Sequence, residues 1–148
     1  MTLAYGFFDE CVQRFNEPTS PDLGIRVWRR FLDVFDLMPV AAVVGGRLLC
    51  MHGGLSPHLS SLDAIEAIPR PAAVPAFGLM CDLLWADPDN TYDGWGTTSR
   101  GISFTFSQSV VNDLCDRFDI DLIVRAHQLT KEVAVRQMEK GHWFDYRW

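Results

Sequence analysis

The chain has 148 residues, enough for one domain, and its composition of 48% hydrophobic and 22% charged residues is typical of a folded globular protein. The formal net charge is -6 and the 13 lysines and arginines are dispersed, which argues against a binder of phosphate backbones, so we expect no nucleic-acid partner. No apolar stretch approaches the roughly 20 residues of a membrane span, and no signal-like segment follows Met1. We therefore expect no membrane association and a cytoplasmic or nuclear location.

Two amphipathic helices are predicted at the start of the chain. Over residues 5–15 apolar side chains recur at spacings of three and four, and Pro18 follows shortly after. A loop is expected over residues 16–24. The next segment places apolar side chains on one face and ends at Pro39; these are Val27, Trp28, Phe31, Leu32, Phe35 and Met38.

The pattern then changes to that of strands. Residues 40–44 and 47–51 read as a buried hairpin, because Gly45-Gly46 supplies the positive φ angles of a two-residue turn. Short helices are predicted over residues 61–68 and 77–85, and the polar stretch 86–100 is predicted to be loop.

The last third of the chain alternates strand and helix. We predict a strand over residues 102–106, a helix over 107–118 with Ser107 as N-cap, and a strand over 121–124. A hairpin is expected from residues 132–137 and 143–146. Without repeats or linkers, the sequence predicts a single α/β domain over residues 1–148.

Cysteine usage fits a reducing compartment. Cys11, Cys50, Cys81 and Cys115 lie far apart in the sequence, form no CxxC pair and sit in apolar runs. Buried free thiols are the favoured interpretation, and disulfides are the alternative.

Two histidines lie where predicted strands end, the position from which side chains project over a sheet edge into a ligand crevice. These are His52, followed by two glycines, and His127. A neutral imidazole is a common ligand for divalent metals, whereas an isolated histidine is more often a hydrogen-bonded core residue. Spacing alone does not decide between the two interpretations.

Charged residues near Trp85 allow similar pairs of interpretations. Arg100 precedes an apolar strand, so its guanidinium either grips phosphate oxygens or is solvated at the surface. Four aspartates flank Trp85 and are either acid/base groups and metal ligands or an acidic surface: Asp82, Asp87, Asp89 and Asp93.

Six segments resemble, in order and spacing, the phosphoprotein phosphatase family, above all the catalytic subunits of types 1 and 2A. They are Tyr-Gly-Phe-Phe-Asp-Glu-Cys at residues 5–11, Leu-Cys-Met-His-Gly-Gly-Leu-Ser-Pro at 49–57, Cys-Asp-Leu-Leu-Trp-Ala-Asp-Pro at 81–88, Gly-Trp-Gly at 94–96, Arg-Gly-Ile-Ser-Phe-Thr-Phe at 100–106 and Arg-Ala-His-Gln at 125–128. The resemblance covers residues 5–128.

This resemblance implies a metallophosphoesterase-type β-sandwich flanked by helices, and hydrolysis of phosphoserine and phosphothreonine in proteins by a water that two divalent ions activate. The ions would be of the manganese, iron or zinc class. His52 and His127 would be ligands of one ion, Arg100 would bind the substrate phosphate, and Tyr5 and Trp85 would line the substrate groove. Phosphoprotein substrates and regulatory subunits would be the partners.

Other motifs of the family do not occur in the sequence. Gly-Asp-x-His-Gly, Gly-Asp-x-x-Asp-Arg-Gly and Gly-Asn-His-Glu, which supply the remaining metal ligands and the general acid, are absent, as is Ser-Ala-Pro-Asn-Tyr-Cys. We therefore expect the N-terminal half of the catalytic core to be missing. Weak or no metal binding, no activity of the chain alone, and unpaired edges on the strands at 40–51 and 121–124 should follow.

Three hypotheses remain at this point. The chain is part of a complete serine/threonine phosphatase, or a catalytically dead fragment that binds phosphatase regulatory subunits, or a non-functional remnant that unfolds without cooperativity. The first is favoured.

Overall fold

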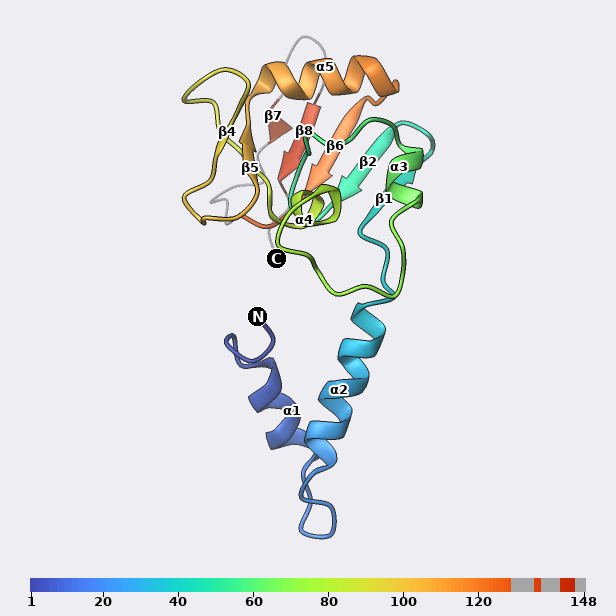
Figure 1. Ribbon diagram of the computed structural model, residues 1–148, viewed down its shortest axis with the longest axis vertical. Coiled ribbons are helices and arrows are strands. Elements are labelled where there is room, and N and C mark those ends of the chain that lie inside the picture. The colour runs from blue at the N-terminus through green and yellow to red at the C-terminus, as the bar shows by residue number, and fades with distance from the viewer. Residues whose placement is uncertain (129–134, 137–141, 146–148) are drawn as a thin grey trace. The chain divides into compact units, whose positions relative to one another are not determined.

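The computed structural model describes residues 1–128, 135–136 and 142–145. The chain divides into two compact units (Figure 1), unit 1 with Met1–Met38 and Pro69–Ala73, and unit 2 with Pro39–Ile68 and Val74–Trp148. The assignment of residues 1–148 to a single domain stays a prediction. Within the described residues, no helix has the length and apolar character to cross a membrane.

Unit 1 is a pair of helices, α1 (Phe7–Phe15) and α2 (Leu23–Phe35), as the apolar spacing predicts. Aromatic rings pack between them, with centroids 5.2 Å apart for Phe7 and Phe31. At Gly24, where the helices approach closely, a Cβ would lie only 2.6 Å from the Cys11 carbonyl oxygen. The prediction of loop through Gly24 is wrong at its end, because α2 begins at Leu23 and the Gly24 N–H donates to the Asn16 side chain at 2.7 Å.

Residues 69–73 join unit 1 through Arg70. Its guanidinium donates to the carbonyl oxygens of Phe35, the last residue of α2, at 2.9 Å and of Met38, in the turn that follows, at 2.8 Å. The Ala72 N–H donates to the Asp36 carbonyl at 3.0 Å. The sequence interpretation of this segment as a helix stop does not predict these contacts.

Unit 2 contains a five-stranded sheet in the order β1-β2-β6-β8-β7. Its strands are β1 (Ala41–Val44), β2 (Leu48–Met51), β6 (Leu122–Arg125), β7 (Val135–Arg136) and β8 (His142–Asp145). β1 pairs antiparallel with β2, which lies parallel to β6, and β6 lies parallel to β8. The predicted first hairpin is confirmed, with φ of 60° and 73° at Gly45 and Gly46. Its prediction as buried is wrong for β1, an edge strand in which Ala42, Val43 and Val44 are exposed.

The strand order of this sheet tests two predictions, the unpaired edges and the second hairpin. β6 has neighbours on both sides, so the unpaired edge expected at residues 121–124 is wrong, whereas β1 is an edge strand of the sheet. β7 pairs antiparallel with β8, as the second predicted hairpin requires. The remainder of that predicted hairpin lies outside the described residues.

A second sheet has the order β3-β5-β4 and consists of β3 (Asp87–Pro88), β4 (Trp95–Thr97) and β5 (Phe104–Phe106). The interpretation of residues 86–100 as loop throughout is wrong, because β3 and β4 lie within that stretch. Strands of two and three residues are too short for an alternating apolar pattern to reveal them. β5 recruits both of them by pairing parallel with β3 and antiparallel with β4.

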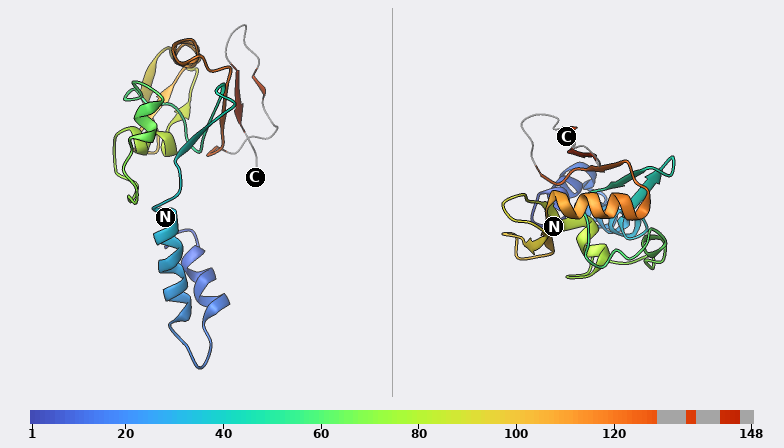
Figure 2. Two further views of the ribbon diagram at one scale, coloured as in Figure 1. Left: turned by 90° about the vertical axis from the view of Figure 1, so that its right-hand side faces the viewer. Right: turned by 90° about the horizontal axis from the view of Figure 1, so that it is seen from above.

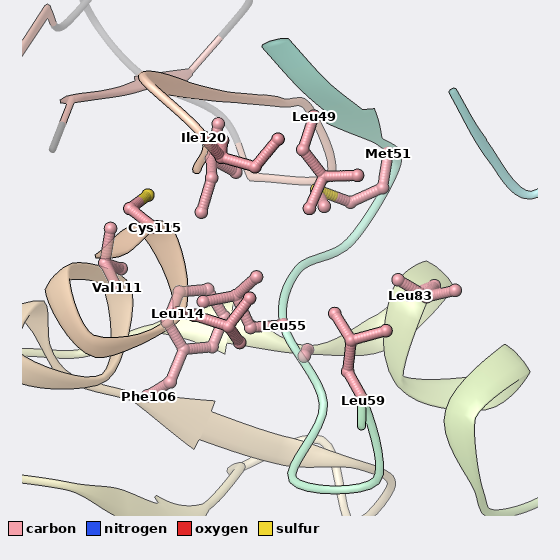
Figure 3. Close-up of a cluster of buried hydrophobic side chains, with 12 residues drawn as sticks. Leu49, Met51, Leu55, Leu59, Leu83, Phe106, Val111, Leu114, Cys115 and Ile120 are labelled. Carbon is pink, nitrogen blue, oxygen red and sulfur yellow. The ribbon is translucent and has the colours of Figure 1, made fainter. Parts of the chain in front are cut away.

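Three helices complete unit 2: α3 (Asp63–Glu66), α4 (Leu79–Trp85) and α5 (Gln108–Phe118). The core draws from both sheets and from α5 (Figure 3); its buried residues are Leu49, Met51, Leu55, Leu59, Leu83, Ala86, Phe106, Val111, Leu114, Cys115, Ile120 and Ile123. Figure 2 shows α5 running across this unit. All four cysteines are free thiols, which confirms that part of the favoured interpretation; Cys11, Cys81 and Cys115 are buried as expected, whereas Cys50 is partly exposed.

Candidate functional site

The two histidines singled out by the sequence meet at one edge of the larger sheet. His52 directly follows β2 and His127 follows β6 after one residue, and these strands are parallel neighbours. The Ala126 N–H donates to the His52 carbonyl oxygen at 3.1 Å. His127 has a φ of 73°, and its Nδ1 lies 3.0 Å from the His52 Nε2. Parallel pairing therefore brings together two imidazoles that are 75 residues apart in the chain.

The glycines after His52 allow α4 to lie against the loop. A Cβ at Gly53 would be 2.4 Å from the Leu84 carbonyl carbon and from the Trp85 nitrogen, and one at Gly54 would overlap the Phe106 ring. The Gly53 N–H donates to the Leu83 carbonyl oxygen at 2.8 Å. This close approach needs glycine because backbone atoms occupy the space of a side chain.

The end of α4 supplies two further groups to the cluster. The Trp85 ring stands edge-on to His127, with centroids 5.5 Å apart. Asp87, two residues later and buried, accepts a hydrogen bond from Arg100 Nε at 2.8 Å and one from Arg125 Nη2 at 2.9 Å. His127 Nε2 lies 3.9 Å from the same carboxylate. Asp87 thus connects the arginines with the histidine pair.

Arg125 is the most deeply buried charged group of this cluster. It donates to the Gly53 carbonyl, to the Ala86 carbonyl at 3.3 Å and to Gln128 Oε1 at 2.7 Å, in addition to Asp87. A guanidinium carries five N–H donors in a fixed plane, so one side chain can satisfy several buried acceptors. Arg125 therefore fastens the loop after β2 and the end of α4 to β6.

The electrostatics of the cluster keep both imidazoles neutral. Burial is the main reason that the pKa of His127 falls to about 4; Asp87 opposes the shift, and Arg100, His52 and Arg125 add to it. The pKa of His52 is also lowered, first by burial and then by Arg125 and Arg100. Both histidines are thus neutral imidazoles at neutral pH, each with one unprotonated ring nitrogen, the state in which imidazole binds metal.

The pair fits part of a metal site. Two nitrogens bound to one ion at about 2.0–2.1 Å lie roughly 2.8–3.4 Å apart for angles between about 90° and 109°, and His52 Nε2 and His127 Nδ1 are 3.0 Å apart. His127 Nε2 is buried without a hydrogen-bond partner in the described structure and faces Asp87. Among the described residues, no group of three or more metal-ligating side chains occurs. Two ligands are fewer than a complete coordination shell requires.

Four of the five residues singled out by the resemblance lie in unit 2 and in this cluster: His52, Trp85, Arg100 and His127. Tyr5 lies in unit 1 and is 84% exposed. The Arg100 side chain is 37% exposed, and in the described part of the chain its terminal nitrogens make no hydrogen bond. The roles assigned to these five residues stay predictions.

Sequence reasoning missed the importance of Asp87 and Arg125. The acidic-surface interpretation is wrong for Asp87 and Asp82, since both are buried. Asp82 accepts hydrogen bonds from Ser56 at 2.6 Å and Ser103 at 2.7 Å. A charged residue that ends an apolar strand, as Arg125 does, was the signal that would have pointed to a buried ion pair.

Known families and structures share this fold. A family described as calcineurin-like phosphoesterase matches residues 7–131. A solved structure of a protein serine/threonine phosphatase from Saccharomyces cerevisiae, with similarity to human phosphatase PP5, is 29% identical with a TM-score of 0.83. The alignment covers 98% of this chain and 43% of the yeast chain, so the chain spans less than half the length of that structure.

Proposed function

The chain belongs to the calcineurin-like phosphoesterase family and, within it, to the phosphoprotein phosphatases, and from this membership we propose that its function is hydrolysis of phosphoserine and phosphothreonine in proteins. The α/β metallophosphoesterase fold is confirmed. Because the chain covers 43% of its yeast relative, the activity is proposed for a complete catalytic core to which these residues contribute. The observation that carries the proposal is the cluster of His52, His127, Asp87 and Arg100 at one sheet edge.

In this proposal His52 and His127 bind one of two divalent ions, of the manganese, iron or zinc class. Such ions, when bound, acidify a water and offset the charge of the phosphoryl group. The facing nitrogens of the two histidines and their lowered pKa values support this role. The remaining ligands must come from residues other than those described.

Asp87 would position His127 rather than touch the substrate. If His127 binds through Nδ1, its proton resides on Nε2, which faces the Asp87 carboxylate. A carboxylate in this place fixes the tautomer and the orientation of a metal-binding imidazole. Arg125 fixes the position of the Asp87 carboxylate through a buried ion pair, and Asp87 would in turn fix the orientation of the His127 ring.

Arg100 would hold the substrate phosphate. Its Nε is committed to Asp87, which leaves the terminal nitrogens to form paired hydrogen bonds with two phosphate oxygens. Trp85, beside His127, and Tyr5 would line the groove for the phosphopeptide. Regulatory subunits as partners and a cytoplasmic or nuclear location complete the proposal.

The test compares Arg100→Ala with Arg117→Ala in a protein that carries the complete core. Arg117 is an exposed residue of α5 and serves as the control. Loss of Arg100 should raise KM for a phosphoserine peptide and lower kcat, with kcat/KM reduced by roughly 10² to 10³. Kinetics of Arg100→Ala that match those of the control would contradict the phosphate-binding role.

A further inference from the structure

An apolar groove of about 230 Å³ lies between the β1–β2 hairpin and α3 in unit 2, away from the histidine cluster. Both elements contribute to its apolar lining: Ala41, Val43 and Leu49 from the hairpin, and Leu62 and Ile65 from the α3 segment. Figure 1 labels α3 and β1, the elements from which most of the lining residues come. None of these side chains takes part in the proposed phosphatase chemistry.

The groove is an uncovered continuation of the hydrophobic core. Val43 pairs with Leu49 across the hairpin, and directly opposed residues of an antiparallel pair share one face of the sheet. Leu49 is fully buried in the core, yet Val43 remains 41% exposed. The core face therefore reaches the edge of the sheet without being covered there.

The same edge offers unpaired backbone groups. In the described part of the chain β1 has one neighbour, β2, so the outer side of Ala41–Val44 has no strand beside it. An extended peptide can pair with such an edge through main-chain hydrogen bonds and place alternate side chains into an adjoining pocket. A strand added beside β1 would direct every second side chain toward Val43 and Ile65.

The rim of the groove is acidic. Asp63 and Glu66 line it, both are exposed, and no basic side chain among the described residues pairs with either carboxylate. The chain as a whole carries a net charge of -6. A partner with a basic residue on the side that faces the groove would complement these two carboxylates.

We propose that β1 and α3 form a docking site for an extended segment of another protein. The segment would add a strand to β1, insert aliphatic side chains at alternate positions beside Val43, and place a lysine or arginine against Asp63 and Glu66. The site is independent of the proposed catalytic function, because no residue of the histidine cluster contributes to it.

The first experiment titrates the full chain into a fluorescein-labelled peptide, Val-Thr-Val-Thr-Lys-Thr, and follows anisotropy. The first, third and fifth side chains of this probe share one face of a strand. Saturable binding is expected. For a peptide with glutamate in place of lysine, Kd should be at least about fivefold higher. On binding, alternate amides of β1 should gain protection from hydrogen exchange, because they become paired with the probe.

Neighbouring valines supply a matched pair of variants. Val43 faces the groove and Val44 faces the opposite side of the same strand, and both are exposed. Val43→Lys should weaken binding about tenfold through lost apolar contact, whereas Val44→Lys should leave it within about twofold. Glu66→Gln, at an exposed position of a helix, should weaken binding roughly two- to fivefold and flatten its salt dependence.

Thermal unfolding of each variant shows whether the fold is retained, and Glu66→Gln keeps the proposal testable if Val43→Lys does not fold. The proposal is overturned if the probe does not saturate at millimolar concentration, or if Val43→Lys and Val44→Lys weaken binding equally. It is also overturned if sedimentation shows a dimer that Val43→Lys dissociates, because a second copy would then occupy the edge.

Discussion

At the scale of single residues, the neutral state of His52 and His127 is a property of the fold. The His127 ring is largely withdrawn from water, the more exposed His52 ring lies against it, and two guanidinium groups stand nearby, so the pKa of each histidine is shifted downward. The unfolded chain binds protons at these positions at a higher pH than the folded chain does. Stability is thereby linked to pH.

The first prediction concerns this linkage in the metal-free chain. His127 titrates near 6.5 when unfolded and about 4 when folded. The neutral His127 therefore contributes on the order of 2–3 kcal/mol to the free energy of unfolding above pH 6.5. This contribution is lost as pH falls toward 4. Urea unfolding between pH 4.5 and 7.5 measures the slope. The variant His127→Gln should give a shallower slope, and parallel curves for the two proteins would contradict the shift.

The second prediction concerns Gly53. Its replacement by alanine would place a Cβ 2.4 Å from backbone atoms of Leu84 and Trp85, which cannot move as a flexible side chain would. A loss of roughly 1–3 kcal/mol in the free energy of unfolding is expected from denaturant midpoints. Gly46→Asn is the control, because its φ of 73° suits asparagine and the position is open. Equal stabilities of the two variants would show that the backbone of α4 shifts to accommodate the added methyl group at little cost.

At the scale of elements, the helices and the long strands follow from the sequence, while the short strands do not. Apolar spacing locates α1, α2 and α5 to within a few residues, and Gly45-Gly46 locates the first hairpin. β3 and β4 have no such pattern, because pairing with β5 rather than local propensity makes them strands.

The candidate site divides in the same way. His52, His127 and Arg100 are recognisable because motifs frame them, and strand ends give their side chains an edge to project from. Asp87 and Arg125 become visible only when α4 and β6 are packed together, since their importance lies in contacts across 38 residues of chain. Local sequence patterns do not encode such a pairing.

The third prediction tests the contact between α1 and α2. Gly24→Ala would bring a Cβ to 2.6 Å from the Cys11 carbonyl oxygen and the Val12 Cα, forcing the helices apart. Amides of α1 should then exchange with deuterium at least about tenfold faster, because the helix depends on its packing rather than on its length. Arg29→Ala, an exposed change in α2, is the control. Unchanged exchange in Gly24→Ala would mean that the pair tolerates the added methyl group.

At the scale of the whole molecule, the two units differ in how they bury apolar surface. The helices of unit 1 contain Cys11 and Gly24 as buried residues, whereas unit 2 holds a cluster of twelve buried apolar side chains. Unit 2 also contains the buried pair of Arg125 and Asp87. Its interior therefore combines apolar packing with a buried carboxylate that two guanidinium groups neutralise.

The fourth prediction follows from that pair. Arg125→Met should lower the stability of the chain by about 3–5 kcal/mol, because Asp87 stays buried while losing one of its two guanidinium partners. Asp87→Asn added to Arg125→Met should recover part of the loss. A double-mutant cycle from urea unfolding gives the coupling energy. Additive effects of the two substitutions would mean that the pair contributes no stability of its own.

The parallel pairing of β2 with β6 also has a consequence for the order of folding. Leu48 pairs with Leu122, so the central strand of the sheet becomes available only after some seventy residues of chain beyond the hairpin. Until then β1 and β2 form an isolated two-stranded ribbon, which is at best marginally stable in water. The chain must close this long loop before the histidine edge exists, and slow folding with exposure to aggregation during synthesis should result.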